Sequence, residues 1–159
     1  MNSIISWVGG KKALRDLIYL RMPTHYDRYI EVFGGGGWVL FGKPPDKCME
    51  DYNDFNTNLA NLYYCVKERP MALLRELSFL PLNSRDEFVT LRKFLTMEEF
   101  KSEHLAEELE IATHFLKEPE AAEICDILKE RAVVGDVKRA AAFYKIVSYS
   151  YGSGCISYG

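Results

Sequence analysis

Apolar and polar residues in the first third of the chain follow two patterns, one typical of strands and one typical of a helix. Residues 29–33 are mostly β-branched or aromatic and predict a short strand. We expect a second strand over residues 47–52, which lead into an acidic segment. Upstream, apolar residues recur at helical spacing and predict a helix with one apolar face: Leu14, Leu17, Ile18 and Met22. The beginning of the chain therefore predicts an α/β unit.

Beyond this unit the pattern predicts a series of helices. The expected ranges are 56–67 and 71–79, as one helix or as two broken at Pro70, and then 84–95, 100–117, 119–128 and 137–150. Two pairs have the spacing of a capping box, Ser84 with Glu87 and Thr96 with Glu99. A large helical region therefore follows the two strands.

A run of four glycines, Gly34, Gly35, Gly36 and Gly37, separates the first predicted strand from the apolar residues 38–41, which we expect to begin a helix. Glycines in such a turn let the backbone approach a ligand where a Cβ atom would collide. Ligands of open α/β sheets bind at the carboxyl ends of the strands, where this turn lies. The turn is a candidate ligand site, and the alternative is a flexible surface loop.

An acidic segment, residues 51–56, lies about 20 residues beyond the glycines, roughly where nucleotide-binding α/β units place a carboxylate on ribose hydroxyls. A carboxylate suits a ribose diol because it only accepts hydrogen bonds. Together with the glycine turn, this favours a nucleoside ligand. The alternative is a capping role, in which Asn56 or Thr57 begins the next helix. The glycines do not have the dinucleotide G-x-G-x-x-G spacing, and the chain has no phosphate-binding G-x-x-x-x-G-K-[ST] motif.

A third candidate segment lies near the N-terminus, where Trp7 precedes Gly9, Gly10 and Lys11. A tryptophan, a bend and a lysine in this order can provide an aromatic wall and a cation for a carboxylate. The alternative is a buried tryptophan beside a solvated pair of lysines.

Together the three segments resemble the Dam-type DNA adenine-N6 methyltransferases. The matching residues are Trp7, Gly9, Gly10 and Lys11 of an aromatic-x-Gly-Gly-Lys segment, Phe33, Gly35 and Gly37 of a Phe-x-Gly-x-Gly motif, and Asn53, Asp54, Asn56, Leu62 and Tyr63 of an Asn-Asp-x-Asn motif with its Leu-Tyr helix. Residues 139–144, which lead to residues 150–152, are similar to the helix before the family's recognition region. The order and spacing of the motifs carry the resemblance, since each motif alone is common.

The resemblance implies a site for S-adenosylmethionine. The turn at residues 33–37 would pass under the methionine part of this cofactor, and Asp54 would accept hydrogen bonds from its ribose. Phe55 would flank the adenine ring, Lys11 would approach the carboxylate, and Trp7 would wall that side. The cofactor-binding residues expected are Trp7, Gly9, Gly10, Lys11, Phe33, Gly34, Gly35, Gly36, Gly37, Asp54 and Phe55.

The chain departs from the family in one important respect, because it has no Asp-Pro-Pro-Tyr segment. In the family this motif holds the flipped adenine by its amino group. The Pro-Pro pair here, Pro44–Pro45, lies between Lys43 and Asp46. We therefore expect the N-terminal, cofactor-binding part of a longer enzyme that methylates adenine N6 in double-stranded DNA at specific sites. We assign no catalytic residue and expect this chain alone to be inactive. The alternative is a non-catalytic module, either a helical interaction domain or a nucleotide-binding regulator.

The expected fold class is α/β, with a partial Rossmann-like methyltransferase sheet and a large helical region. We divide the chain into a cofactor-binding segment, residues 1–67, a helical region, residues 68–150, and the start of a recognition part, residues 151–159. Without a neighbouring strand from the rest of the enzyme, the first strand has an open edge. We expect the chain to self-associate through that edge, or to cover it with residues 149–158.

Composition narrows the class of protein further. Of 159 residues, 48% are hydrophobic and 27% are charged, as in soluble globular domains, and no apolar stretch is long enough for a membrane span. The four cysteines lack metal-ligand spacing and the three histidines are scattered, so we expect no metal site and a cytoplasmic location with reduced thiols. The net charge of −3 gives no direct sign of tight DNA binding. Late aromatic residues are core residues or, alternatively, base-stacking residues: Phe143, Tyr144, Tyr149, Tyr151 and Tyr158.

Overall fold

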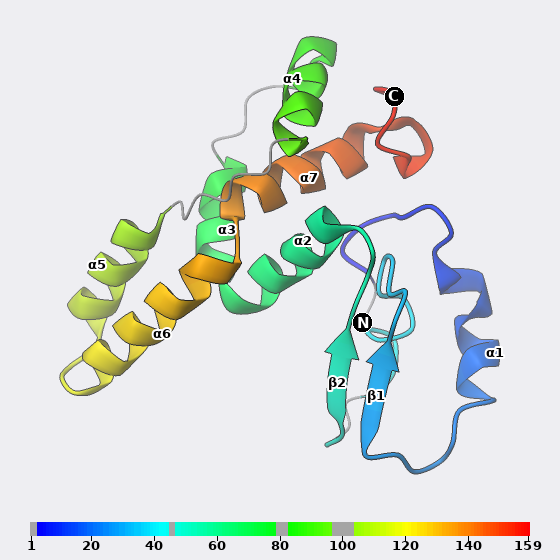
Figure 1. The fold of residues 1–159 in the computed structure, drawn as a ribbon, viewed down its shortest axis with the longest axis horizontal. Helices are drawn as coiled ribbons and strands as arrows, with labels where there is room; N and C mark the ends of the chain where they lie inside the picture. Colours follow the sequence, from blue (N-terminus) through cyan, green and yellow to red (C-terminus); the bar gives the residue numbers. More distant parts are fainter. Residues whose placement is uncertain (1–2, 45–46, 79–82, 97–103) are drawn as a thin grey trace.

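A computed structural model describes residues 3–44, 47–78, 83–96 and 104–159 of the chain. It confirms an α/β fold in which a small sheet stands beside a larger group of helices (Figure 1). The sheet has two parallel strands, β1 (Arg28–Glu31) and β2 (Met49–Tyr52), with Ile30 opposite Asp51. Both strands overlap the ranges that the sequence predicts, and β1 ends early because the glycine turn bends the chain soon after Glu31.

The helices follow the predicted order. They are η1 (Lys11–Leu14) and α1 (Arg15–Tyr19) before the sheet, and α2 (Thr57–Glu68), α3 (Pro70–Ser78), α4 (Arg85–Leu95), α5 (Leu105–Phe115), α6 (Glu120–Val134) and α7 (Val137–Tyr149) after it. A short turn, η2 (Tyr151–Ser153), follows α7. The predicted break at Pro70 separates α2 from α3. The expected Thr96–Glu99 capping box, the beginning of the helix predicted from residue 100, and Phe79 lie outside the described residues.

One expectation for the N-terminal part is wrong. Residues 38–41 form successive turns instead of a helix, because the Leu40 amide donates to Oε2 of Glu31 (3.0 Å) and not to a backbone carbonyl, and Gly42 and Pro44 follow closely. The helix predicted before the sheet is present as η1 and α1, and its apolar residues Leu14 and Leu17 are 56% and 53% exposed. The spacing of apolar residues predicted this helix, but in the described chain no element covers that face fully.

Helices α2 and α7 form the centre of the hydrophobic core, and α3 and α4 pack against α7 (Figure 1). Ala140 and Ala141 on α7 are fully buried, and their small side chains let the helices approach closely. The same core cluster includes Ile5 near the N-terminus, and the ring of Tyr63 on α2 lies 4.8 Å from that of Tyr52 on β2. The α/β part and the helical part therefore share one core.

The C-terminal residues fold back onto the helical part. Ser150 forms an antiparallel bridge with Tyr158, whose ring lies 5.9 Å from that of Phe88 on α4. This placement contradicts the expectation that residues 149–158 cover the open edge of β1. Within the described residues, β1 is paired with β2 alone. Among the described helices, none has both the length and the apolar character that a membrane span requires.

Candidate functional site

The four glycines that follow β1 form a compact turn with specific steric demands. The amide of Gly34 donates to the carbonyl of Asn53 (2.9 Å), and the amide of Gly37 donates to the carbonyl of Gly34 (2.9 Å). A Cβ atom on Gly34 would lie 2.1 Å from the Tyr52 ring, so only glycine fits there. Gly35 and Gly37 have positive φ angles of +52° and +66°, which residues with side chains rarely adopt.

Side chains from β2 and α2 hold this turn by its carbonyl groups. The Tyr52 hydroxyl donates to the carbonyl of Gly35 (2.8 Å), and the Tyr63 hydroxyl donates to that of Gly36 (2.8 Å). Burial raises the pKa of both tyrosines above its ordinary value, so both hydroxyls remain protonated donors at neutral pH. The turn is therefore fixed in shape, and the alternative of a flexible surface loop does not fit these contacts.

Asp54 connects the turn to the beginning of α2. Its Oδ2 atom accepts a hydrogen bond from the amide of Gly35 (2.8 Å), and its Oδ1 atom accepts one from the amide of Asn56 (2.9 Å). Because a carboxylate has about four acceptor positions, these two bonds leave capacity for a diol. The carboxylate predicted from the sequence therefore lies directly at the glycine turn.

Lys11 reaches the same turn from the N-terminal segment. Its Nζ atom donates to the carbonyl of Phe33 (2.5 Å) and lies 3.5 Å from Oε1 of Glu31. Glu31 is only 6% exposed, and its Oε2 atom accepts the amide of Leu40 (3.0 Å). Burial raises the pKa of the Glu31 carboxyl, while the Lys11 ammonium and the Leu40 amide act in the opposite direction.

Trp7 and its neighbouring glycines complete the contact between the three segments. The amide of Gly10 donates to the carbonyl of Trp7 (3.0 Å), and Gly9 has a φ of +74°. A Cβ atom on Gly35 would lie 3.2 Å from Cδ1 of Trp7, so the indole borders the turn. Phe55, which follows Asp54, is 93% exposed and is therefore accessible to a ligand from solvent.

The structure thus brings Trp7, Lys11, the glycines and Asp54 together, and it leaves Phe33, at 71% exposed, and Phe55 on the surface. The sequence did not single out Glu31 or Tyr52 as side chains that shape the site, and it named Tyr63 only as part of the matched Leu-Tyr segment. A signal for Glu31 was present, because it is the sole charged residue in the apolar run of residues 29–33. The tyrosine contacts have no local signal, since they join residues far apart in the sequence.

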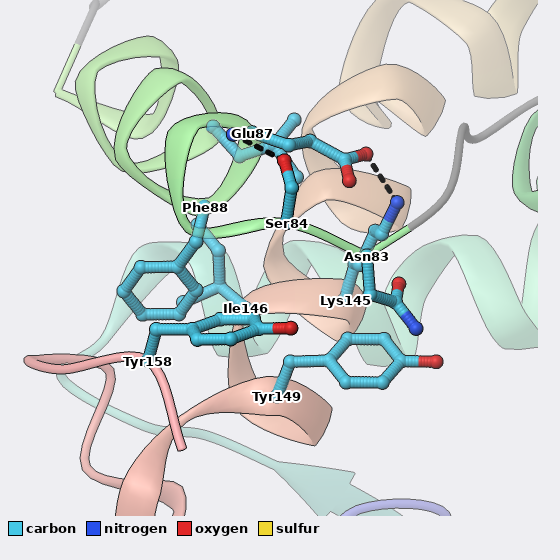
Figure 2. Close-up of a pocket in the computed structure, with 9 residues that line it drawn as sticks. Asn83, Ser84, Glu87, Phe88, Lys145, Ile146, Tyr149 and Tyr158 are labelled. Atoms are coloured by element: carbon cyan, nitrogen blue, oxygen red, sulfur yellow. Dashed lines mark hydrogen bonds and ion pairs between the residues drawn. The ribbon is translucent and has the colours of Figure 1, made fainter.

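A second concave feature lies in the helical part, between α4, α7 and the C-terminal residues (Figure 2). This pocket is lined by Phe88, Tyr149, Tyr158 and the ion pair of Lys145 with Glu87. Of the late aromatic residues, Phe143 is a core residue at 2% exposed and Tyr151 is 79% exposed. Among the described residues, no three His, Cys, Asp or Glu side chains cluster as metal ligands.

Comparison with known proteins identifies the family. The family model of the D12 class N6 adenine-specific DNA methyltransferases matches residues 7–134, which include all of the candidate site. The chain therefore belongs to this family, whose members use S-adenosylmethionine and methylate DNA.

Three relatives show how much of such an enzyme the chain spans. It is 37% identical over 93 residues to the type II methyltransferase M1.LlaDCHI of Lactococcus lactis, covering 58% of this chain and 32% of the relative. It is 30% identical over 95 residues to a DNA adenine methylase of Vibrio cholerae (58% and 33% covered). It is 32% identical over 103 residues to the type II methyltransferase M.MjaIII of Methanocaldococcus jannaschii (57% and 32%). The chain spans about a third of the length of these relatives.

Proposed function

We propose that this chain binds S-adenosylmethionine and forms the donor-binding part of a site-specific DNA adenine-N6 methyltransferase. The observation that carries the proposal is the fixed glycine turn, which Trp7, Lys11 and Asp54 approach from two other segments. Such a turn exposes backbone where a Cβ atom would fill the space, and a carboxylate and an ammonium at the turn suit a nucleoside and an amino acid.

The residues of the site have distinct parts in this proposal. Asp54 would accept hydrogen bonds from the ribose hydroxyls, and Lys11 would pair with the cofactor carboxylate. Trp7 would flank the cofactor on the side of its carboxylate, and the exposed ring of Phe55 would flank the adenine. S-adenosylmethionine supplies an activated methyl group, and the chain's own residues orient it, because in-line transfer depends on positioning.

The first test is calorimetric titration of the chain with S-adenosylmethionine. The Asp54→Ala variant is expected to lose about 1.5–3 kcal/mol of binding free energy, the range for hydrogen bonds to a charged group. Gly35→Val is expected to bind more weakly still, since valine opposes the positive φ and faces the Trp7 ring. Asp51→Ala is the matched control, because Asp51 bonds Arg28 on the sheet and lies outside the turn.

Two results would contradict the proposal. A folded wild-type chain that binds no S-adenosylmethionine has no donor site. A wild-type chain that binds the cofactor, with the Asp54 and Gly35 variants binding equally well, has its site elsewhere. Circular dichroism of each variant separates loss of the site from loss of the fold.

We also propose that this chain alone transfers no methyl group to DNA, because its sequence contains no Asp-Pro-Pro-Tyr segment to hold the acceptor amine. The measurement is incorporation of radiolabelled methyl groups into unmethylated duplex DNA. Labelled N6-methyladenine formed by a pure sample would overturn this expectation. Absence of transfer together with cofactor binding would agree with a donor-binding part that acts with further residues.

A further inference from the structure

Glu31 is a buried carboxylate that the proposed cofactor contacts do not use directly. It is the last residue of β1 and is 6% exposed. A charged group in such a place needs partners, and each of its oxygens has one. Oε1 lies 3.5 Å from the Lys11 ammonium, and Oε2 accepts the amide of Leu40 (3.0 Å). Tyr29 on the same strand also acts to lower the pKa of this carboxyl.

Lys11 differs from Glu31 in being accessible, with 36% of its side chain exposed. Its ammonium has three donors. Within the described residues, the carbonyl of Phe33 (2.5 Å) takes one of them and Glu31 lies beside another. A third donor therefore remains for a group that enters from solvent at the glycine turn. A lysine on a four-carbon stem otherwise samples many rotamers, and this freedom is lost when it binds a ligand.

We propose that Glu31 is a positioning residue, which holds the Lys11 ammonium beside the turn at residues 33–37 so that it meets the carboxylate of S-adenosylmethionine. This inference rests on the function proposed above. Glu31 lowers the entropy cost of binding by fixing Lys11 in advance. It also reduces the net charge that the carboxylate encounters, and a loss of binding on its removal would show that positioning outweighs this electrostatic cost.

The test compares two ligands that share the adenosine part. S-adenosylhomocysteine has the amino-acid carboxylate, and 5′-methylthioadenosine lacks it. In titrations of the full chain, Glu31→Gln and Lys11→Met are each expected to lower the affinity for S-adenosylhomocysteine about tenfold, the scale of one charge-assisted hydrogen bond. The affinity of each variant for 5′-methylthioadenosine is expected to stay within about twofold of that of the wild-type chain.

A double variant identifies the route of the effect. If Glu31 acts through Lys11, then the chain with both substitutions binds S-adenosylhomocysteine no more weakly than Lys11→Met alone. Glu50→Gln is the matched control, because Glu50 is a carboxylate of the same sheet that pairs with Lys43. This variant is expected to leave the affinity for both ligands unchanged. If Glu31→Gln does not fold, Glu31→Asp retracts the charge from Lys11 and is expected to give the same ligand-selective loss.

Several outcomes would overturn the inference. Equal losses for both ligands would show a structural role for Glu31, and additive losses would show that it does not act through Lys11. Unchanged or tighter binding by Glu31→Gln would show that charge, not position, governs the contact. A wild-type chain that binds neither ligand would refute the donor site itself. A wild-type chain that binds both ligands, with no effect of Glu31→Gln on either affinity, would refute only the positioning role.

Discussion

Gly34 and Gly35 both require glycine, and for different physical reasons. Gly34 lies under the Tyr52 ring, where a Cβ atom would be 2.1 Å from a ring carbon. Gly35 has a φ of +52°, and a Cβ atom there would lie 3.2 Å from the nearest side-chain atom of Trp7. Lack of space excludes a side chain at Gly34, whereas the positive φ angle is the main reason that a side chain is unfavourable at Gly35. A run of glycines in this family motif is therefore a set of separate constraints and not a general source of flexibility.

Asp54 shows how one side chain can serve the fold and a ligand together. Its two oxygens already accept the amides of Gly35 and Asn56, so the carboxylate is held in place before any ligand arrives. The two interpretations that the sequence left open, capping and ribose binding, are therefore compatible in physical terms. Its ribose role stays a proposal that the titration of Asp54→Ala addresses.

Helix α2 begins directly after this carboxylate, and Asn56 is its N-cap. The Asn56 side chain accepts hydrogen bonds from the amides of Asn58 (3.1 Å) and Leu59 (3.2 Å). We expect Asn56→Ala to lower the free energy of unfolding by about 1 kcal/mol, measured by urea denaturation. Asn56→Ser is the control and should retain most of the stability, because serine also caps helices. A serine variant as unstable as the alanine variant would show that capping is not the reason.

The elements that the sequence predicts well are those set by neighbouring residues. Ser84 accepts the amide of Glu87 (3.1 Å) at the beginning of α4, and Asp136 accepts that of Arg139 (2.9 Å) at the beginning of α7. Caps of this kind act over three residues, so a pattern in the sequence reveals them. The same is true of the strand, glycine turn and acidic segment, whose order predicted the candidate site.

The elements that the sequence predicts poorly depend on distant contacts. Residues 38–41 have an apolar pattern, yet the Leu40 amide donates to Oε2 of Glu31 and the segment remains a series of turns. The Glu31–Lys11 and Tyr63–Gly36 contacts likewise join residues far apart in the sequence. Periodicity carries no information about such contacts, so these polar contacts could be identified only in the structure.

At the scale of the whole molecule, the small sheet has an open strand edge among the described residues. Among the described residues, β1 is paired on one side by β2, and the C-terminal residues pack on α4 instead of on its other side. Large apolar side chains of the two strands and the residue after β1 are exposed: Ile30 at 51%, Val32 at 52% and Met49 at 62%. An open strand edge with apolar neighbours is a template for pairing with another chain.

We therefore expect the isolated chain to self-associate through β1. Sedimentation velocity over a range of protein concentrations should show a monomer that converts to a larger species as concentration rises. Val32→Lys is expected to shift this equilibrium toward the monomer, because a charge next to a strand edge opposes pairing. Leu74→Lys is the control, since Leu74 is similarly exposed, at 62%, but lies on α3 in the helical part. A wild-type chain that stays monomeric at every concentration would contradict the expectation. Equal effects of the two lysines would show that the chain associates by general hydrophobic contact and not through the strand.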